Sequence, residues 1–227
     1  MIDVSQADAT RGSIGPLSAA DFNEDGNVDL AVRSCDDATT RLFRGNGDGT
    51  FTYDHDVLTG YCGNLTVSAD VNGDGHADLL ATDNFSPSLA ILLGDGAGGF
   101  AISFLTLPGT AYWRSVGDLN RDGHPDVVLT HGHYVTVLLG NGDGTFQAPR
   151  ETQDPDQDLT YFTVADFNRD GNPDVAAAHN NPADGRIALL CGDGMGNLSP
   201  PEHLMLGGNP GCVVEGDFNG DGLPDMV

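Results

Sequence analysis

Five short acidic segments contain the residues of this sequence that could do chemistry. Each repeats Asp-x-Asn-x-Asp-Gly-x-x-Asp, and they begin at Asp21, Asp70, Asp118, Asp166 and Asp217. Positions 1, 3 and 5 place three oxygen-bearing side chains on one tight turn, Gly at position 6 lets the backbone fold back, the carbonyl of position 7 adds an oxygen, and Asp at position 9 closes the cage. Because all these donors are hard oxygens, the pattern predicts Ca²⁺ binding, since Zn²⁺ favours Cys or His and Mg²⁺ keeps several waters.

An EF-hand begins with the same residues and is the main alternative. It needs a bidentate Glu at position 12 and flanking helices. Position 12 here is apolar in the first four segments, at Val32, Ala81, Leu129 and Ala177. Solvated acidic turns without metal are the second alternative, and they are disfavoured because uncompensated carboxylates this close repel one another.

The elements that position these segments are predicted to be short strands. The acidic segments start 49, 48, 48 and 51 residues apart, and a second glycine-rich element such as Leu138-Leu-Gly-Asn-Gly-Asp-Gly-Thr-Phe146 lies between them. A period near 50 residues with two turns per unit indicates a repeat architecture. Runs such as 66–70 and 77–82 are too short for helices, and Tyr134–Leu139 and Thr145–Gln147 flank a tight Asn-Gly turn. The sequence predicts an all-β fold, a β-propeller of four-stranded antiparallel blades.

This pattern resembles the FG-GAP repeat of integrin α-subunit propellers and its bacterial relative, the VCBS-type repeat. The likeness covers nearly the whole chain and includes phrases such as Asp217-Phe-Asn-Gly-Asp-Gly-Leu-Pro-Asp225. It implies an integrin-α-like propeller in which each acidic loop joins the first and second strands of a blade and binds Ca²⁺, up to five ions in all. The implied ligands are Asp21, Asn23, Asp25, Asn27 and Asp29; Asp70, Asn72, Asp74, His76 and Asp78; Asp118, Asn120, Asp122, His124 and Asp126; Asp166, Asn168, Asp170, Asn172 and Asp174; and Asp217, Asn219, Asp221, Leu223 and Asp225. Position 7 of each loop, His76 and His124 included, is expected to give backbone oxygen only.

The repeat spacing divides the chain into expected blades. One propeller domain is predicted over 1–227, with blades at about 14–62, 63–110, 111–158 and 159–208 and a partial blade at 209–227. Residues 1–13 align with the last strand of a preceding blade. Since integrin-like propellers usually close with seven blades, we expect four complete blades plus partial ones, a fragment of a larger ring whose open edges invite pairing with missing blades or further chains.

Composition excludes several classes of partner. The chain has 34 acidic residues against 9 Arg and no Lys, for a formal charge of −25. Nucleic acids and anionic membranes need clustered basic residues, so neither is expected. No run of about 18 apolar residues would insert into a membrane.

Aromatic residues and histidines gather in the loops predicted on the face away from calcium. They are Tyr61, Tyr112, Trp113, His131, His133, Tyr134, Tyr161 and His179. Amphipathic aromatics on loops are enriched where proteins contact sugars or other proteins, so a glycan or extracellular protein is the expected partner. The alternative is that they pack the ends of inner strands. His131 and His133 are a poor zinc pair because no third ligand is near in sequence.

Cysteine content and calcium affinity both favour an extracellular or cell-surface protein, although no signal peptide is visible in this chain. Extracellular calcium modules bind weakly enough to need millimolar calcium. The four cysteines are even in number, and Cys35 and Cys62 are predicted on one face, where they could form a disulfide.

No catalytic motif is visible, so no enzymatic activity is expected. Two function classes remain. The first is a calcium-stabilised binding module for adhesion or for recognition of carbohydrates or proteins. The second is the propeller scaffold of a secreted polysaccharide-degrading or other carbohydrate-active enzyme.

Overall fold

The computed structural model describes residues 14–34, 38–59, 66–82, 85–111, 113–156, 159–179, 185–207 and 213–226. Within these ranges every regular element is a β-strand and none is a helix. The chain divides into two compact units, residues 1–111 and 112–227, which are described separately.

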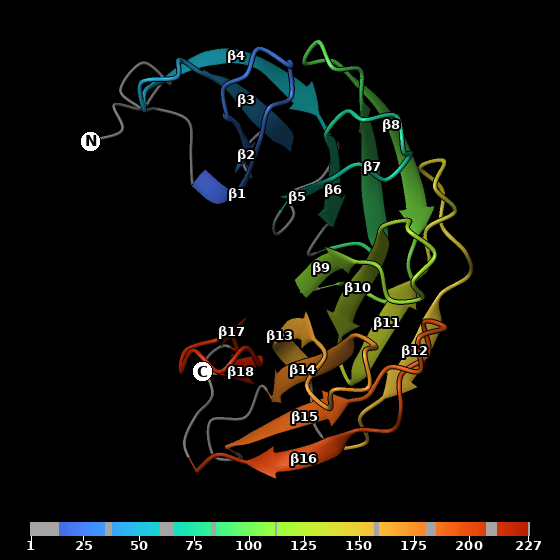
Figure 1. Ribbon diagram of the computed structural model, residues 1–227. Coiled ribbons are helices and arrows are strands. Elements are labelled where there is room, and N and C mark those ends of the chain that lie inside the picture. Colours follow the sequence, from blue (N-terminus) through green and yellow to red (C-terminus); the bar gives the residue numbers. More distant parts are fainter. Residues whose placement is uncertain are drawn as a thin grey trace. The chain divides into compact units, whose positions relative to one another are not determined.

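The first unit contains two four-stranded antiparallel sheets, each a meander in which every strand pairs with the next along the chain (Figure 1). The strands of the first sheet are β1 (Ile14–Ala20), β2 (Asp29–Ser34), β3 (Thr39–Gly45) and β4 (Phe51–Leu58). Those of the second are β5 (Thr66–Ala69), β6 (Asp78–Thr82), β7 (Ser88–Gly94) and β8 (Phe100–Thr106).

The second unit repeats this arrangement twice and adds a two-stranded sheet. The third blade contains β9 (Trp113–Gly117), β10 (Asp126–His131), β11 (Tyr134–Leu138) and β12 (Arg150–Gln153). The fourth contains β13 (Leu159–Ala165), β14 (Asp174–His179), β15 (Arg186–Leu190) and β16 (Glu202–Met205). The last sheet pairs β17 (Glu215–Gly216) with β18 (Asp225–Met226).

The second and third strands of each blade form the core. Every residue of β6, β10 and β14 is buried, whereas the fourth strands β8, β12 and β16 contain only partly buried and exposed residues. Strands covered on both faces need apolar side chains at successive positions, and runs such as Asp126-Val-Val-Leu-Thr130 supply them. In the second unit one apolar cluster joins blades 3 and 4 through Leu119, Val128 and Val175. In the first unit Phe22, Leu42 and Leu79 belong to a cluster that joins blades 1 and 2.

The fourth strands of blades 3 and 4 begin later than the sequence predicts. The predicted strand Thr145–Gln147 forms one isolated bridge, between Phe146 and Gly140, and regular pairing resumes at Arg150. Prolines explain the delay, because Pro149 precedes β12, Pro200 and Pro201 precede β16, and proline has no N–H for the ladder. Blades 1 and 2 lack prolines there, and their fourth strands start at Phe51 and Phe100.

The predicted all-β fold of four-stranded antiparallel blades is confirmed. The predicted blade boundaries and the single domain remain predictions. The expected strand of a preceding blade, residues 1–13, lies outside the described residues.

Candidate metal sites

Each acidic loop lies between the first and second strands of a blade, as the loops joining β1 to β2 and β9 to β10 illustrate. The glycine at position 6 has a positive φ in all five loops, from 82° at Gly222 to 91° at Gly75. L-residues rarely adopt this conformation, so glycine is needed to reverse the chain. The residue at position 4 also has a positive φ. In three loops it is not glycine but Glu24, Arg121 or Arg169.

Backbone amides hold the side-chain oxygens on the inside of each loop. In the first loop, Asp21 accepts hydrogen bonds from the amides of Asp25 at 3.2 Å and Gly26 at 2.9 Å. Asn23 Oδ1 accepts the Asp25 amide at 2.9 Å, and Asp25 Oδ1 accepts the Asn27 amide at 2.8 Å. The other four loops repeat these bonds. The loop backbone therefore curls around oxygens from positions 1, 3 and 5.

In the first four loops the Asp at position 9 has a different environment, because it is buried and joins the loop to the hairpin between the third and fourth strands. Asp126 has no exposed surface. Its Oδ2 accepts the amide of Leu119 at loop position 2, and its Oδ1 accepts the amide of Gly140, both at 2.8 Å. Asp29, Asp78 and Asp174 make the equivalent bonds to their own loops and to Gly45, Gly94 and Gly192. We call this pair of bonds the aspartate clasp.

The glycine in each clasp is required for space. A Cβ on Gly140 would lie 2.3 Å from the carbonyl oxygen of Pro125, and one on Gly45 would lie 2.1 Å from that of Val28. Only glycine brings its amide close enough to the buried carboxylate without a clash. The two repeated motifs of the sequence are therefore two halves of one structural feature.

The two kinds of loop carboxylate have pKa values displaced in opposite directions. Burial raises the pKa of Asp78, Asp126 and Asp174 at position 9. At position 5, the hydrogen bond from the position 7 amide is the main cause of the lowered pKa of Asp25, Asp74, Asp122 and Asp170. The exposed position 5 carboxylates are thus held in the charged form that a dication needs.

Neighbouring loops in the first unit are joined by a side-chain contact. Nδ1 of His76, at position 7 of the second loop, lies 2.5 Å from Oε1 of Glu24, at position 4 of the first. The hydrogen bond to Glu24 is the main cause of the raised pKa of His76. This imidazole is therefore engaged by a carboxylate of the neighbouring blade, and the prediction that position 7 gives only backbone oxygen remains a prediction.

The loops offer a suitable donor set for Ca²⁺. Positions 1, 3 and 5 provide carboxylate and amide oxygens on one turn, which are the hard donors that Ca²⁺ prefers. The carboxylates at positions 1, 5 and 9 do not each bring an oxygen within 4.8 Å of the others, since position 9 is turned onto its clasp. The predicted calcium ligands are of the type that Ca²⁺ prefers. Their joint coordination of one ion remains a prediction.

The residues predicted for a recognition face are only partly described. Tyr61 and Tyr112 lie outside the described residues, and the side chain of Trp113 on β9 is not described. Tyr161 on β13 is 38% exposed. His131 is buried, with Nε2 2.9 Å from Thr136 Oγ1 and 3.0 Å from Glu151 Oε1, and its ring stacks on Tyr134.

The backbone carbonyl of His133 accepts the amide of Asp154 at 2.7 Å. His179 is 1% exposed. Buried His131 and His179 match the alternative that such residues pack strand ends, whereas Tyr161 is partly exposed. The proposed Cys35 and Cys62 pair lies outside the described residues, and Cys191 is a free thiol.

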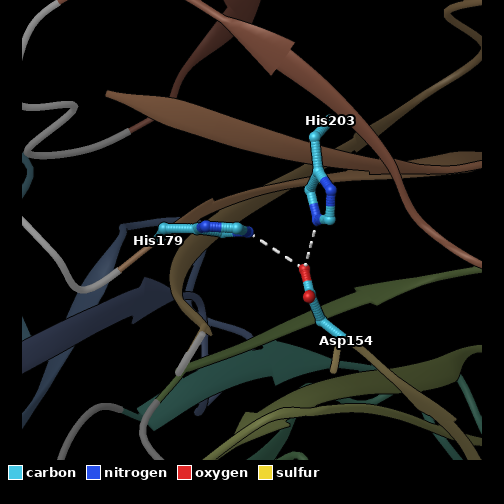
Figure 2. A group of neighbouring side chains, drawn as sticks. All are labelled: Asp154, His179 and His203. Carbon is cyan, nitrogen blue, oxygen red and sulfur yellow. Dashed lines mark hydrogen bonds and ion pairs between the residues drawn. The ribbon is translucent and has the colours of Figure 1, made fainter. Parts of the chain in front are cut away.

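His179 belongs to a cluster that the sequence did not predict, together with Asp154 and His203 (Figure 2). Nε2 of His179 and Nε2 of His203 each lie 2.9 Å from the same Asp154 oxygen, Oδ2. Within the part of the chain that the structure describes, it is the one group of three His, Cys, Asp or Glu side chains whose ligand atoms lie within 4.8 Å of one another. No sequence signal marks it, because the three residues lie 25 and 24 positions apart and are not repeated.

Repeated four-stranded antiparallel blades with an acidic loop after each first strand define a repeat protein of the propeller type. A family model described as FG-GAP-like repeat matches residues 21–81, 70–129, 118–177 and 166–227. The chain belongs to the FG-GAP-like repeat family, which confirms the resemblance seen in the sequence. None of the curated protein sequences compared with the chain matches it.

Solved structures of similar fold include a lectin and a protein with a protein partner. An Agrocybe aegerita lectin, described as specifically recognising non-reducing terminal N-acetylglucosamine, matches with a TM-score of 0.61 and 25% identity over 83% of this chain and 51% of that chain. BBS1N, solved in complex with ARL6DN, matches with a TM-score of 0.66 and 12% identity over 90% of this chain and 60% of that chain. The chain thus spans between half and three-fifths of the length of these two proteins. At 12% identity, the likeness to BBS1N shows the fold alone.

Over the residues described, we find no helix with the length and apolar character needed to cross a membrane.

Proposed function

We propose that this chain is a calcium-binding module that works outside cells in adhesion or in recognition of glycans or proteins, without catalysis. The observation that carries the proposal is the acidic loop, repeated with the same donors and the same backbone hydrogen bonds in each blade. A pattern retained five times in one chain, always between the first and second strands, points to a shared task of these loops.

Positions 1, 3 and 5 of each loop, with the carbonyl of position 7, would hold Ca²⁺, and the Asp at position 9 would complete the site when the loop closes around the ion. The ion supplies positive charge that offsets the three carboxylates of each loop. The aspartate clasp carries this local effect into the blade, because Asp126 contacts both the loop and the β11–β12 hairpin. Ordering of the loop therefore stabilises a connection between the first and last strands of the same sheet.

Recognition as the task of the module is supported by the lectin of similar fold, and the acidic composition is compatible with it. The lectin shares 25% of aligned residues and is described as recognising a sugar terminus. A glycan brings hydroxyl groups and no phosphate, so the net charge of −25 does not oppose it. Extracellular location is supported by the calcium chemistry, because modules outside cells bind Ca²⁺ with dissociation constants of about 10⁻⁴–10⁻³ M.

Calcium binding is tested by isothermal titration of the protein without a purification tag. We expect Ca²⁺ to bind in several sites and Asp122→Asn to remove one of them. Asp143→Asn is the matched control, because Asp143 is an equally exposed carboxylate that accepts the Thr145 amide in a hairpin turn and lies outside the acidic loops. Absence of calcium binding, or equal loss in both variants, contradicts the proposal.

Recognition is tested on a glycan array in Ca²⁺ and again in EDTA. We expect calcium-dependent binding to a defined group of glycans, with N-acetylglucosamine-terminated glycans included because of the lectin likeness. Cleavage of an arrayed polysaccharide would contradict the non-catalytic role and favour the enzyme-scaffold alternative. Absence of glycan binding would leave protein adhesion as the recognition task to test.

A further inference from the structure

The cluster of Asp154, His179 and His203 connects two blades of the second unit. Asp154 follows β12, the last strand of blade 3. His179 ends β14 and His203 lies on β16, the second and fourth strands of blade 4. Asp154 and His179 have fully buried side chains, and that of His203 is 21% exposed.

Three atoms that can each bind a metal converge in this cluster. Both imidazole Nε2 atoms point at Oδ2 of Asp154 (Figure 2). The other carboxylate oxygen, Oδ1, accepts the Asp156 amide at 2.9 Å. Since a carboxylate oxygen and an imidazole lone pair repel each other, either a hydrogen on each Nε2 or a metal cation has to lie between them.

Distances and chemistry fit a transition-metal dication. Ligands bound at about 2.0–2.1 Å in tetrahedral geometry lie about 3.3 Å apart, so the 2.9 Å contacts need to open by only about 0.4 Å. Two imidazoles with one carboxylate suit Zn²⁺ and similar ions, and differ from the oxygen-only acidic loops that suit Ca²⁺. His203 is the one partly exposed member of the cluster, at 21%, and three protein ligands would leave a position for water.

The surroundings of His203 also match a metal ligand. Its second nitrogen, Nδ1, lies 3.6 Å from Oδ2 of Asp156, and Arg186 binds the same oxygen at 2.9 Å. Histidines that bind metals commonly direct the other ring nitrogen at a carboxylate, which orients the ring and favours the tautomer with a free Nε2.

Blade 3 shows what the same positions look like without a third ligand. His131 ends β10 as His179 ends β14, and Glu151 pairs with Thr136 as His203 pairs with Ala188. His131 and Glu151 form a two-member contact at 3.0 Å. Blade 4 replaces the Glu by His and receives Asp154 from blade 3, which converts a pair into a three-ligand set.

We propose that Asp154, His179 and His203 bind one Zn²⁺ or similar transition-metal ion, distinct from the calcium predicted in the acidic loops. The ion ties the last strand of blade 3 to the second and fourth strands of blade 4. This site does not depend on calcium binding by the loops, so the two proposals stand or fall separately.

The test is a titration of metal-stripped, untagged protein with Zn²⁺ and with Co²⁺ at a calcium concentration that saturates the acidic loops. We expect one Zn²⁺ per chain, with Co²⁺ giving the visible absorption typical of nitrogen and oxygen ligands in four-coordinate geometry. His203→Gln removes a ligand at the partly exposed position, and we expect its affinity to fall by more than about tenfold, since changes outside the ligand set already cost about that much. Asp156→Asn keeps all three ligands and should weaken binding by about tenfold while one ion still binds.

His55→Gln is the matched control, because His55 on β4 is also paired with an aspartate, Asp54, at 2.9 Å, and has no third ligand-type side chain within the 4.8 Å limit among the described residues. This variant should bind Zn²⁺ like the wild type. Circular dichroism of each variant before titration establishes that it is folded. A Zn²⁺-dependent rise in the melting temperature of the wild type, measured in the same calcium buffer, tests the site without any substitution.

Two results overturn the proposal. One is the absence of Zn²⁺ binding by the calcium-saturated wild type, which leaves the cluster as two histidines donating to a buried carboxylate. The other is equal Zn²⁺ affinity in wild type and folded His203→Gln, which places the ion elsewhere.

Discussion

The acidic loops and the Asp154, His179 and His203 cluster offer metal ligands in two different ways. Each loop takes its donors from nine consecutive residues, exposes most of them and repeats five times. The cluster takes three donors from residues spread over 50 positions, buries two of them completely and occurs once. A loop is therefore organised by local hydrogen bonds before the blade is complete, whereas the cluster exists only when two blades are packed together.

The largest expected effect is the loss of thermal stability on calcium removal, since five loops are compared with one cluster. An unchanged melting temperature would contradict this difference between loops and cluster. Ca²⁺ that binds only folded loops adds about 2.7 kcal/mol per loop at a hundredfold excess over the dissociation constant. A chain of this size loses about 2–4 °C of melting temperature per kcal/mol, so EGTA should lower the melting temperature by at least about 10 °C. A chelator selective for zinc acts on one site and should lower it less. Scanning calorimetry measures both, and equal effects of the two chelators would contradict the difference in number of sites.

The second largest effect concerns the clasp and separates its structural role from calcium. In calcium-free protein, Asp126→Ala leaves two buried amides without an acceptor and should cost about 3 kcal/mol of unfolding free energy. Asp122→Ala, in the same loop but exposed, should cost no more than about 1 kcal/mol. Urea denaturation in EGTA provides the comparison. If both variants lose the same unfolding free energy, the buried clasp of Asp126 adds no more stability than the exposed loop bonds of Asp122.

A smaller effect is expected from the glycine on the other side of the clasp. Gly140→Ala puts a Cβ 2.3 Å from the Pro125 carbonyl oxygen, and relief of that clash should cost about 2 kcal/mol. Gly123→Ala has no atom within 4 Å of the new Cβ and suffers only from its φ of 86°, at about 1 kcal/mol. If thermal melts rank the two variants in the opposite order, backbone strain in the loop outweighs close approach at the clasp.

The smallest effect tests strain at loop position 4. Arg169 has φ of 65°, so Arg169→Gly should stabilise the protein by less than about 1 kcal/mol. Glu24→Gly relieves the same strain but loses the contact with His76, and it should gain less than Arg169→Gly or destabilise. Urea melts of both variants measure this difference. A loss of stability in Arg169→Gly would show that the arginine side chain contributes more than its backbone costs.

Much of the fold follows from the sequence because its signals are local and repeated. The Asp-Gly and Asn-Gly pairs predict turns, and Gly47, Gly142 and Gly194 do have positive φ. The short β-rich runs predict four-stranded blades, which the structure contains. The late start of β12 does not follow from the Asn-Gly turn that predicts a strand at Thr145, because the turn signal carries no information on the missing N–H of Pro149.

The sites were predictable to different extents for the same reason. The loop donors follow from spacing alone, but the burial of Asp126 and its bond to Gly140 depend on how the β11–β12 hairpin folds back onto the loop. The cluster was beyond prediction from one sequence, since His179 and His203 meet Asp154 only through packing of blade 4 on blade 3.

The aspartate clasp also determines where a blade can change in length. Its carboxylate and its hairpin glycine are separated by 16, 16, 14 and 18 residues in the four blades, yet the two hydrogen bonds are the same. The differences fall where the second strand turns into the third, between Ser34 and Thr39 in blade 1 and between His131 and Tyr134 in blade 3. Peptide inserted there lengthens only the connection between the second and third strands and leaves the clasp unchanged. New binding loops can therefore evolve, or be grafted, at one end of each blade while the other end keeps its form.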